Sequence, residues 1–336
     1  MSSINKPILR QHNRIWASII LVVLGIVFVT SFVLSIMYGA ADVSITRVIH
    51  ILWAPTTGVT DTIIWDVRLP RGIAGVLVGT DLALAGLLLQ GILRNPLADP
   101  HIMGISSGAG LMGVVVLILC PALTYLITPV AFIGAMLAAV WVYGLAWKNG
   151  IRPVRVILAG VAVASLLGSI ISGILIFYSD RVHGALMWMA GGLGNVGWDS
   201  VVLLWPYTLI GIILTMVSSY YLNLLQLGDD MARGLGLPVE RTRFLLTALA
   251  SLLAASAVSV VGLLGFVGLI VPHMARLLLG GDYRLMVPGT ILLGSSLVLF
   301  SDTVARVMFA PVEIPVGLIT AILGTPFFLF LLRKEM

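Results

Sequence analysis

Residues 66–110 read DVRLPRGIAGVLVGTDLALAGLLLQGILRNPLADPHIMGISSGAG, and this stretch decides the fold. An apolar run begins after Arg68 and Arg71 and ends at Arg94. At ~22 residues and ~1.5 Å per residue, it is long enough to cross a hydrocarbon core of ~30 Å. A loop broken by proline and glycine follows at once, and irregular backbone at membrane depth is tolerated only where protein or a water-filled path surrounds it. This arrangement is typical of transport proteins.

The composition indicates a membrane protein along the whole chain. Of its 336 residues, 60% are hydrophobic and 10% are charged, against about 25% charged in an ordinary soluble domain. We expect an all-α, polytopic membrane protein with about ten transmembrane helices, forming a single transmembrane domain over residues 1–336. Two of the expected spans, 265–279 and 286–301, fall short of a full crossing and predict tilted or partial helices. The expected spans are 15–38, 72–93, 102–119, 122–147, 156–178, 200–225, 244–263, 265–279, 286–301 and 312–332.

The basic residues predict the orientation. If both termini are cytoplasmic and the spans alternate, 14 of the 19 Lys and Arg residues lie inside, as the positive-inside rule expects. The net charge of +5 then reflects topology in a lipid bilayer rather than nucleic-acid binding. Three of the five outer arginines border spans and run against the bias: Arg68, Arg71 and Arg306.

Several kinds of catalytic chemistry have no signature in the chain. A phosphate-binding P-loop needs a lysine followed by Ser or Thr, but Lys6, Lys148 and Lys334 precede Pro, Asn and Glu. The five histidines are scattered without the spacing of a metal site. We therefore expect a non-enzymatic protein with no resident cofactor or metal, which does not itself hydrolyse ATP.

Two kinds of transporter remain. Ion-coupled carriers usually place several ionisable groups at the bilayer midplane, and here only Asp81 lies clearly inside a span. An ATP-driven importer needs a surface on which a separate ATPase acts, and residues 226–243 suit that role as a cytoplasmic coupling loop. In this loop Asp229 could cap a short helix, Gly236 could end it in a left-handed conformation and Pro238 could open a second one. The spacing alone is also compatible with a plain solvated loop.

Eight sequence blocks, taken in order, carry a family resemblance. The chain resembles the FecCD-type permeases of bacterial ABC importers, which move ferric siderophores, haem or cobalamin. The blocks are RLPR at 68–71, LALAGLLLQGILRNPLADP at 82–100, GISSGA at 104–109, WMAGGLG at 188–194, GDDMARGLGLP at 228–238, GFVGLIVPHMAR at 265–276, SDTVAR at 301–306 and EIPVGLITAILGTP at 313–326.

The resemblance implies a type II importer permease fold with ten helices per subunit in the bacterial cytoplasmic membrane. It implies four kinds of partner: a second permease copy, in a homodimer or heterodimer, two cytoplasmic ATPase subunits, an external substrate-binding protein, and membrane lipid. The expected cargo is a ferric siderophore. Cobalamin or haem is the alternative within the family, and an ion-coupled secondary transporter is the alternative outside it.

The resemblance also implies roles for individual residues. Arg68, Arg71 and Arg306 match external arginines that pair with glutamates of the binding protein; lipid head groups or an intrachain pair such as Arg306 with Asp302 are the alternative. Asn95, Pro96 and Leu97 match the cytoplasmic gate loop, with a second constriction expected near residues 152–154. The residues matching ATPase-coupling helices are Gly228, Asp229, Asp230, Ala232, Leu235, Gly236, Leu237 and Pro238.

Asp81 departs from the family pattern, in which small apolar residues are usual. An aspartate facing lipid at mid-span costs ~2.5–3.5 kcal/mol on insertion scales. We therefore expect it either to line the pathway, in contact with substrate or pore water, or to be buried and hydrogen-bonded between helices.

Overall fold

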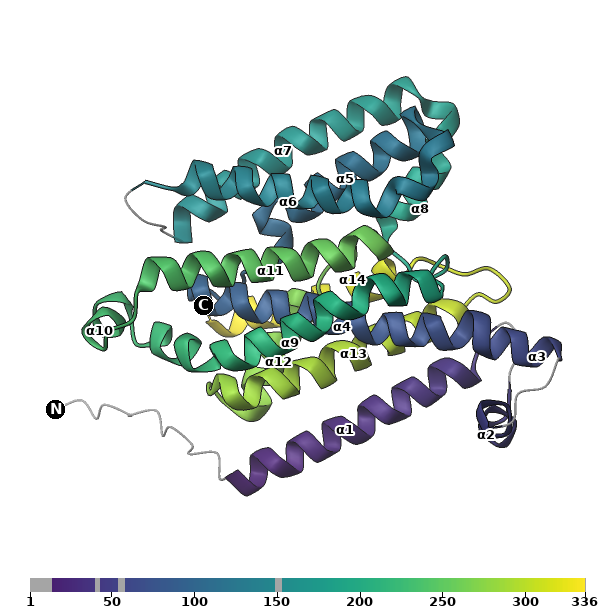
Figure 1. The fold of residues 1–336 in the computed structure, drawn as a ribbon, viewed down its shortest axis with the longest axis horizontal. Coiled ribbons are helices and arrows are strands. Elements are labelled where there is room, and N and C mark those ends of the chain that lie inside the picture. The colour runs from purple at the N-terminus through teal and green to yellow at the C-terminus, as the bar shows by residue number, and fades with distance from the viewer. Residues whose placement is uncertain (1–13, 40–42, 54–57, 149–152, 336) are drawn as a thin grey trace.

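The computed structural model describes residues 14–39, 43–53, 58–148 and 153–335, and its regular elements are helices (Figure 1). The fold is all-α and polytopic, as predicted. By length and composition seven helices of the described chain can each cross a membrane, and three shorter apolar helical stretches accompany them, at 105–119, 267–279 and 316–329. The helices that match the predicted spans in order are α1 (Arg14–Met37), α4 (Leu69–Leu93), α5 (Ile105–Val114), α6 (Ile127–Ala146), α7 (Pro153–Phe177), α9 (Trp198–Gln226), α11 (Val239–Val261), α12 (Val267–Leu279), α13 (Tyr283–Val307) and α14 (Val316–Glu335).

Short helices mark the two ends of the molecule. At one end α2 (Ile45–Trp53), α3 (Val59–Thr62) and the π-helix η1 (Ile63–Arg68) lead into α4, and we call this the α3 end. At the other end α10 (Asp229–Gly234) joins α9 to α11, and we call this the α10 end (Figure 1). The remaining short elements are η2 (Pro100–Met103), η3 (Val115–Leu119), η4 (Pro121–Leu126), η5 (Ser179–Arg181) and α8 (Val182–Ala190).

The core is built around α4, which is buried over most of its length. It packs against α9, α11, α12 and α13. Two of its glycines permit this, because a Cβ on Gly79 would collide with the backbone of Gly294, and one on Gly86 with that of Gly268. In a membrane, where apolar surface alone does not drive helices together, such close backbone contact stabilises the packing.

The two predictions of short spans had different outcomes. The one for 265–279 is confirmed, because α12 has 13 residues. The one for 286–301 is wrong, because α13 runs for 25 residues from Tyr283 to Val307. Its last turns carry Asp302 and Arg306, which pair with each other and are both buried. An apolar run read from sequence stops at such charges, whereas the helix continues through them.

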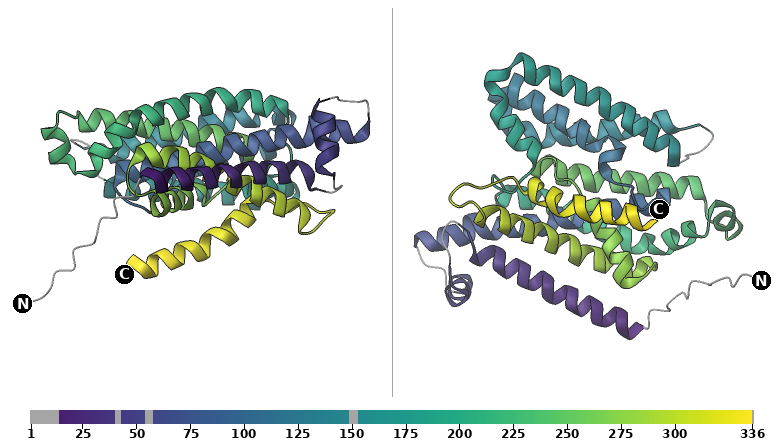
Figure 2. Two further views of the ribbon diagram at one scale, coloured as in Figure 1. Left: turned by 90° about the horizontal axis from the view of Figure 1, so that it is seen from below. Right: turned by 180° about the vertical axis from the view of Figure 1, so that it is seen from behind.

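Irregular backbone separates the short apolar helices from their neighbours. The chain has no α-helix between Arg94 and Gly104, and it is again irregular from Gly262 to Phe266, where α11 ends and α12 begins. A third break lies between α13 and α14. Figure 2 shows α14 slanting away from the layer formed by the other helices. Residues of α14 and of the first two breaks line a common cavity.

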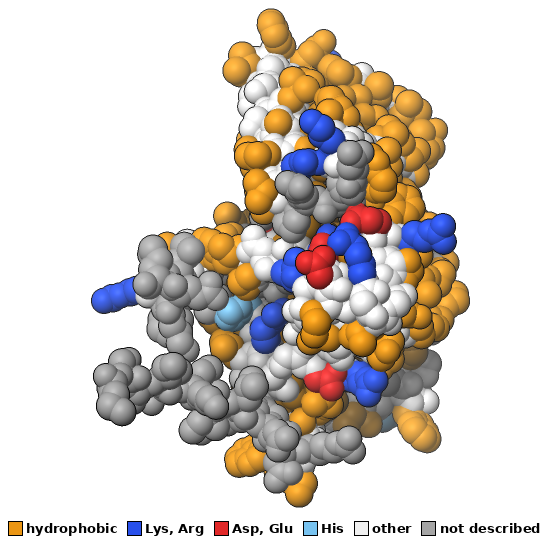
Figure 3. All heavy atoms as spheres, turned by 90° about the vertical axis from the view of Figure 1, so that its left-hand side faces the viewer, with side chains coloured by type: hydrophobic (Ala, Val, Ile, Leu, Met, Phe, Trp, Pro, Cys, Tyr) orange, Lys and Arg blue, Asp and Glu red, His pale blue; other side chains and the backbone are white. Residues whose placement is uncertain are grey.

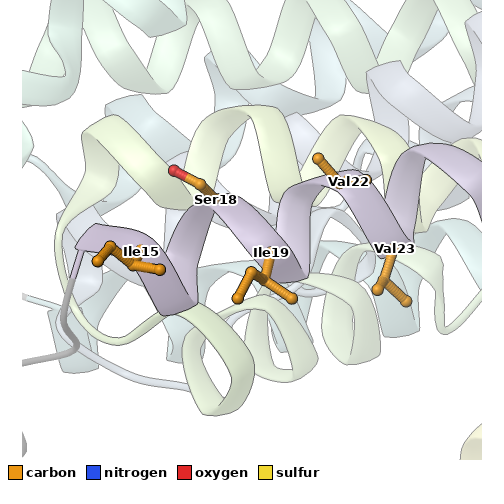
Figure 4. A pocket seen from close by; sticks show the side chains of 5 residues that line it. All are labelled: Ile15, Ser18, Ile19, Val22 and Val23. Atoms are coloured by element: carbon orange, nitrogen blue, oxygen red, sulfur yellow. The ribbon is translucent and has the colours of Figure 1, made fainter.

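The outward face of α1 is apolar and exposed, as expected of a helix in contact with lipid. A shallow hollow of about 470 Å³ lies against it, lined by Ile15, Ser18, Ile19, Val22 and Val23 (Figure 4). All five belong to one helix and only one is polar, so the hollow lacks the converging polar groups of a ligand site. We assign this face to lipid.

Candidate functional site

The predicted gate loop is a rigid turn at the end of α4. Arg94 ends the helix in a left-handed conformation with φ of 47°, and the backbone N–H of Asn95 donates to the carbonyl of Gln90 at 3.2 Å. The side-chain oxygen of Asn95 then accepts from the backbone N–H of Leu97 at 2.9 Å. This local side-chain bond fixes the turn. The polar residue of the predicted gate therefore shapes the loop, and Leu97 is the gate residue that reaches a cavity.

That cavity has a volume of about 480 Å³. Its walls come from the gate loop, from the irregular segment before α12 and from α14. The lining is mostly apolar and aromatic with two ionisable side chains, Asp99 and His101. Irregular backbone thus lines a hollow here, which is the situation in which it is tolerated at membrane depth. The lining residues are Leu97, Asp99, His101, Leu263, Gly265, Phe266, Leu269, Gly317, Ala321 and Phe328.

The three arginines predicted to lie outside gather at the α3 end in one buried cluster. Arg71 donates to both oxygens of Asp302, with its closest contact from Nη2 to Oδ1 at 2.8 Å, and its Nη1 donates to Glu313 Oε2 at 2.9 Å. Arg306 Nε lies 3.0 Å from Asp302 Oδ2. Such fork-shaped contacts suit the planar guanidinium group. Two of the three arginines therefore share one buried carboxylate.

The other contacts of the cluster close the carboxyl end of α1. Arg68 Nη1 donates to the carbonyls of Ile36 and Met37 at 2.8 Å each. Arg306 donates to the carbonyls of Ser35 at 2.8 Å and Tyr38 at 3.2 Å. The last carbonyls of a helix lack partners within it and carry partial negative charge, so two guanidinium groups stabilise this end.

These contacts change the interpretation of the arginines. Docking to a partner calls for accessible side chains, but Arg68, Arg71 and Arg306 are only 4%, 6% and 5% exposed. The intrachain pair of Arg306 with Asp302, named above as the alternative, is present. The role of the arginines in docking a binding protein stays a prediction. Sequence reasoning missed Glu313, the half-exposed carboxylate of the cluster, because it lies outside the recognised arginine motifs.

The coupling loop contains one short helix rather than two. The helix α10 covers Asp229–Gly234, and Gly236 follows it with φ of 84°, in the left-handed region that we predicted. Pro238 precedes the first residue of α11, but α11 is a long helix of 23 residues, so the prediction of a second short helix is wrong. Met231 and Leu235 are exposed on α10, whereas Ala232 and Leu237 are buried beneath it.

Asp229 does not cap α10, contrary to our expectation. Gly228 occupies the capping position, and no side chain caps the helix there. The carboxylate of Asp229 instead contacts two arginines from other elements. Arg243 of α11 donates to both of its oxygens at 2.8 and 3.0 Å, and Arg94 Nη2 lies 3.0 Å from Oδ1. Neither Arg94 nor Arg243 was identified as a partner of Asp229 from the sequence.

Asp81 lies inside the helix packing, with no exposed surface. Thr208 of α9 donates to Asp81 Oδ2 at 3.0 Å, and Ser256 of α11 donates to the same oxygen at 3.2 Å. These are the contacts of the second alternative, an aspartate hydrogen-bonded between helices. Asp81 is not among the residues that line the cavity. A role for it in the pathway stays a prediction.

Charged side chains gather at the α10 end. Figure 3 views this end directly and shows basic and acidic side chains over its centre, with apolar side chains on the flanks. Ion pairs here join Arg94 and Arg243 to Asp229, and Arg233 to Asp230 and Glu240. Of the second predicted constriction, residue 152 lies outside the described residues. Two apolar side chains, Met231 of α10 and Leu235 directly after it, are exposed at this charged end.

Known proteins resemble this chain over most of its length. It is 39% identical over 325 residues to the Fe(3+)-citrate import system permease protein YfmD of Bacillus subtilis, covering 97% of this chain and 96% of that protein. It is 42% identical over 283 residues to the cobalamin import system permease protein BtuC of Halobacterium salinarum, covering 83% of this chain and 76% of that protein.

A solved structure agrees with the fold. It is described as an inward-facing conformation of a metal-chelate type ABC transporter, and it superposes with a TM-score of 0.84 at 30% identity, over 94% of this chain and 99% of the other. Residues 22–334 match the model of the FecCD transport family. The chain is a multi-pass membrane protein of the FecCD transport family, an ABC importer permease.

Proposed function

We propose that this permease moves a ferric siderophore or a similar iron chelate across the bacterial cytoplasmic membrane. The observation that supports an iron chelate is the likeness to an Fe(3+)-citrate permease over 97% of the chain. The cavity beside the gate loop is consistent with weak binding, because its lining is mostly apolar and offers few ligands to a metal. ATP hydrolysis belongs to two partner ATPase subunits, and no residue of this chain is catalytic.

Cobalamin is the second candidate cargo. It is favoured by the 42% identity to a cobalamin permease, which extends over a smaller share of the chain. Haem is the third candidate cargo, and it is favoured by 39% identity over 293 residues to the hemin transport system permease protein HmuU of Yersinia pestis, covering 84% of this chain. Selectivity for any of these would reside largely in the external binding protein, since a mostly apolar pathway discriminates poorly between bulky ligands.

Uptake by purified components tests the cargo. The permease would be reconstituted in liposomes with its ATPase subunits, and the genomically neighbouring binding protein would be loaded with radiolabelled ferric citrate, a ferric hydroxamate, haem or cobalamin. We expect ATP-dependent uptake of an iron chelate. ATP-dependent uptake of cobalamin alone would transfer the assignment to the second candidate. Uptake driven by an ion gradient without ATPase subunits would overturn the ABC mechanism.

We propose that the α3 end faces outward and the α10 end faces the cytoplasm, with one transmembrane domain over residues 1–336 and both termini inside. The excess of basic residues predicted on the cytoplasmic side supports this orientation. The start of α1 and the end of α14 both point toward the α10 end (Figures 1 and 2). A second permease copy would complete the pathway, as a homodimer or a heterodimer.

The same proposal assigns the outer cluster to docking. A glutamate of the binding protein could reach Arg71 by replacing Glu313, the cluster carboxylate that is 45% exposed. Asp302 would keep its own contacts with Arg71 and Arg306, because it is buried. Docking in this form requires an exchange of carboxylates rather than a free arginine.

At the cytoplasmic end, α10 would contact the ATPase through Met231 and Leu235. The loop at Asn95, Pro96 and Leu97 would close the pathway beside the cavity that Leu97 lines. In alternating access, a movement of α10 caused by the ATPase must then change the position of the gate loop.

A further inference from the structure

Asp229 connects three elements that are distant in sequence. It begins α10, and Arg243 of α11 holds its carboxylate with two hydrogen bonds, from Nη2 to Oδ1 at 2.8 Å and from Nη1 to Oδ2 at 3.0 Å. Arg94, at the end of α4, reaches the same Oδ1 at 3.0 Å. The Arg243 side chain is only 2% exposed, whereas those of Asp229 and Arg94 are 25% and 40% exposed. Arg243 is therefore the buried member of the trio, and Arg94 is its most exposed member.

Arg94 also belongs to the gate loop through its backbone. It has φ of 47°, a conformation that side-chain-bearing residues rarely adopt. The next residue, Asn95, is bonded on one side to the carbonyl of Gln90 and on the other to the N–H of Leu97. Few backbone dihedrals are thus free between Arg94 and Leu97. A pull on the Arg94 side chain would act at the start of the turn that ends at Leu97, a residue of the cavity wall.

The ion pairs of Arg233 do not reach the gate loop. Arg233 contacts Asp230 within α10 and Glu240 at the start of α11, and both contacts stay within residues 230–240. Asp229 does contact this loop, through Arg94 at its start. A shift of α10 that moves Asp229 acts on Arg94 directly.

We propose that the ion pair of Asp229 with Arg94 transmits movement of α10 to the gate loop, so that both are positioning residues for transport. This inference rests on the proposed coupling role of α10 and the proposed gate role of residues 95–97. It adds the connection between them. Removing Arg94 leaves the Arg243 contact intact, so α10 should keep its place while the gate no longer follows it.

The test uses the complete transporter in liposomes, with permease, ATPase subunits and loaded binding protein. In Arg94→Gln we expect ATP hydrolysis stimulated by the binding protein to stay near the wild-type rate. We expect cargo moved per ATP to fall about fivefold or more, the lower end of typical coupling between sites. Arg94→Lys should recover part of the loss, because lysine keeps the charge without the fork. Arg284→Gln, an exposed arginine at the same end, is the matched control and should behave as wild type.

A second readout does not depend on transport. In a Cys120→Ser background, a cysteine at position 97 would report how fast a thiol reagent reaches the gate. We expect the labelling rate to change when ATP is added, and to lose that response in Arg94→Gln. In a double-mutant cycle, adding Arg94→Gln to Asp229→Asn should reduce the cargo moved per ATP little further, because Asp229→Asn has already removed the ion pair.

The outcomes separate this inference from the function on which it rests. If Arg94→Gln transports with the wild-type ratio and keeps the ATP response at position 97, the link is wrong. The proposed coupling role would still stand if Gly236→Val, which disturbs the corner after α10, abolishes uptake. If Gly236→Val also leaves uptake unchanged, the coupling assignment itself is wrong.

Discussion

Replacing Glu313 by glutamine should strengthen capture of the loaded binding protein. In the proposed docking, a partner glutamate must take the place of Glu313 on Arg71, from which Glu313 Oε2 is 2.9 Å distant. Glutamine keeps the shape and loses the charge, so the internal competitor weakens. The folded state should be little affected, because Arg71 retains its buried contacts with Asp302.

The size of the effect follows from the exposure of the pair. Glu313 is 45% exposed, and ion pairs in contact with water are worth ~0.2–1 kcal/mol. A tenfold change in affinity corresponds to ~1.4 kcal/mol, so release of this pair should lower the Kd of docking by up to ~5-fold. Most of the gain should disappear at high salt, since exposed charges are screened.

Binding of fluorescently labelled binding protein to the transporter in nanodiscs, at two salt concentrations, measures this change. Arg71→Gln is the companion variant and should weaken binding. Asp302→Asn is the structural contrast: it leaves two buried guanidinium groups without their carboxylate, a loss of ~3–5 kcal/mol, and should reduce the yield of folded protein.

Weaker docking in Glu313→Gln would refute the competition argument, because it would mean that Glu313 holds Arg71 in the docking position. Unchanged docking in Arg71→Gln would refute the assignment of the cluster to docking altogether. The cluster would then serve only to join α1, α4 and α13.

Three further predictions concern coupling, topology and packing. Gly236→Val should abolish uptake without preventing membrane insertion, because a β-branched residue at φ of 84° costs ~1–2 kcal/mol or more; uptake and membrane-fraction blots measure the two effects. In a Cys120→Ser background, a cysteine at exposed Val59 should react with an impermeant thiol reagent added to intact cells, and one at Lys148 should not; labelling at Lys148 would overturn the orientation. Gly86→Ala should lower the thermal stability of the detergent-solubilised permease, because its Cβ collides with backbone and overpacking costs ~1–3 kcal/mol; an unchanged melting temperature would contradict the close contact of α4 with α12.

The order and number of the apolar helices could be predicted from the sequence because a membrane span has one strong requirement, a long apolar run. The match is closest at α1, predicted over 15–38 and found over Arg14–Met37, where no charge interrupts the apolar run after Arg14. It failed at the end of α13, where Asp302 and Arg306 end the apolar run but not the helix. A hydropathy profile treats each charge as facing water or lipid. It contains no information on the ion pair between Asp302 and Arg71, which are 231 residues apart.

The candidate site was predictable only in part for the same reason. The resemblance identified the segments, and local geometry at Gly236 agreed with the expectation of a left-handed residue. The resemblance did not predict which side chains contact one another. Asp229 was expected to act locally as a helix cap, but its carboxylate contacts Arg94 and Arg243, whose positions depend on the packing of α4 and α11. Contacts between distant segments are a property of the tertiary structure, and a single sequence does not contain them in readable form.

The arginines that close the end of α1 have a consequence for the synthesis of the protein. Arg306 and the Ser35 carbonyl to which it donates are 271 residues apart. When α1 leaves the ribosome, neither Arg68 nor Arg306 has been made, so its last carbonyls must be satisfied by water or lipid head groups. Arg68 becomes available early, with α4, but Arg306 arrives only with the second-last apolar helix. The helix α1 thus reaches its final hydrogen bonding only when translation is nearly complete, and in chains that stop before α13 the carbonyls of Ser35 and Tyr38 lack the hydrogen bonds from Arg306.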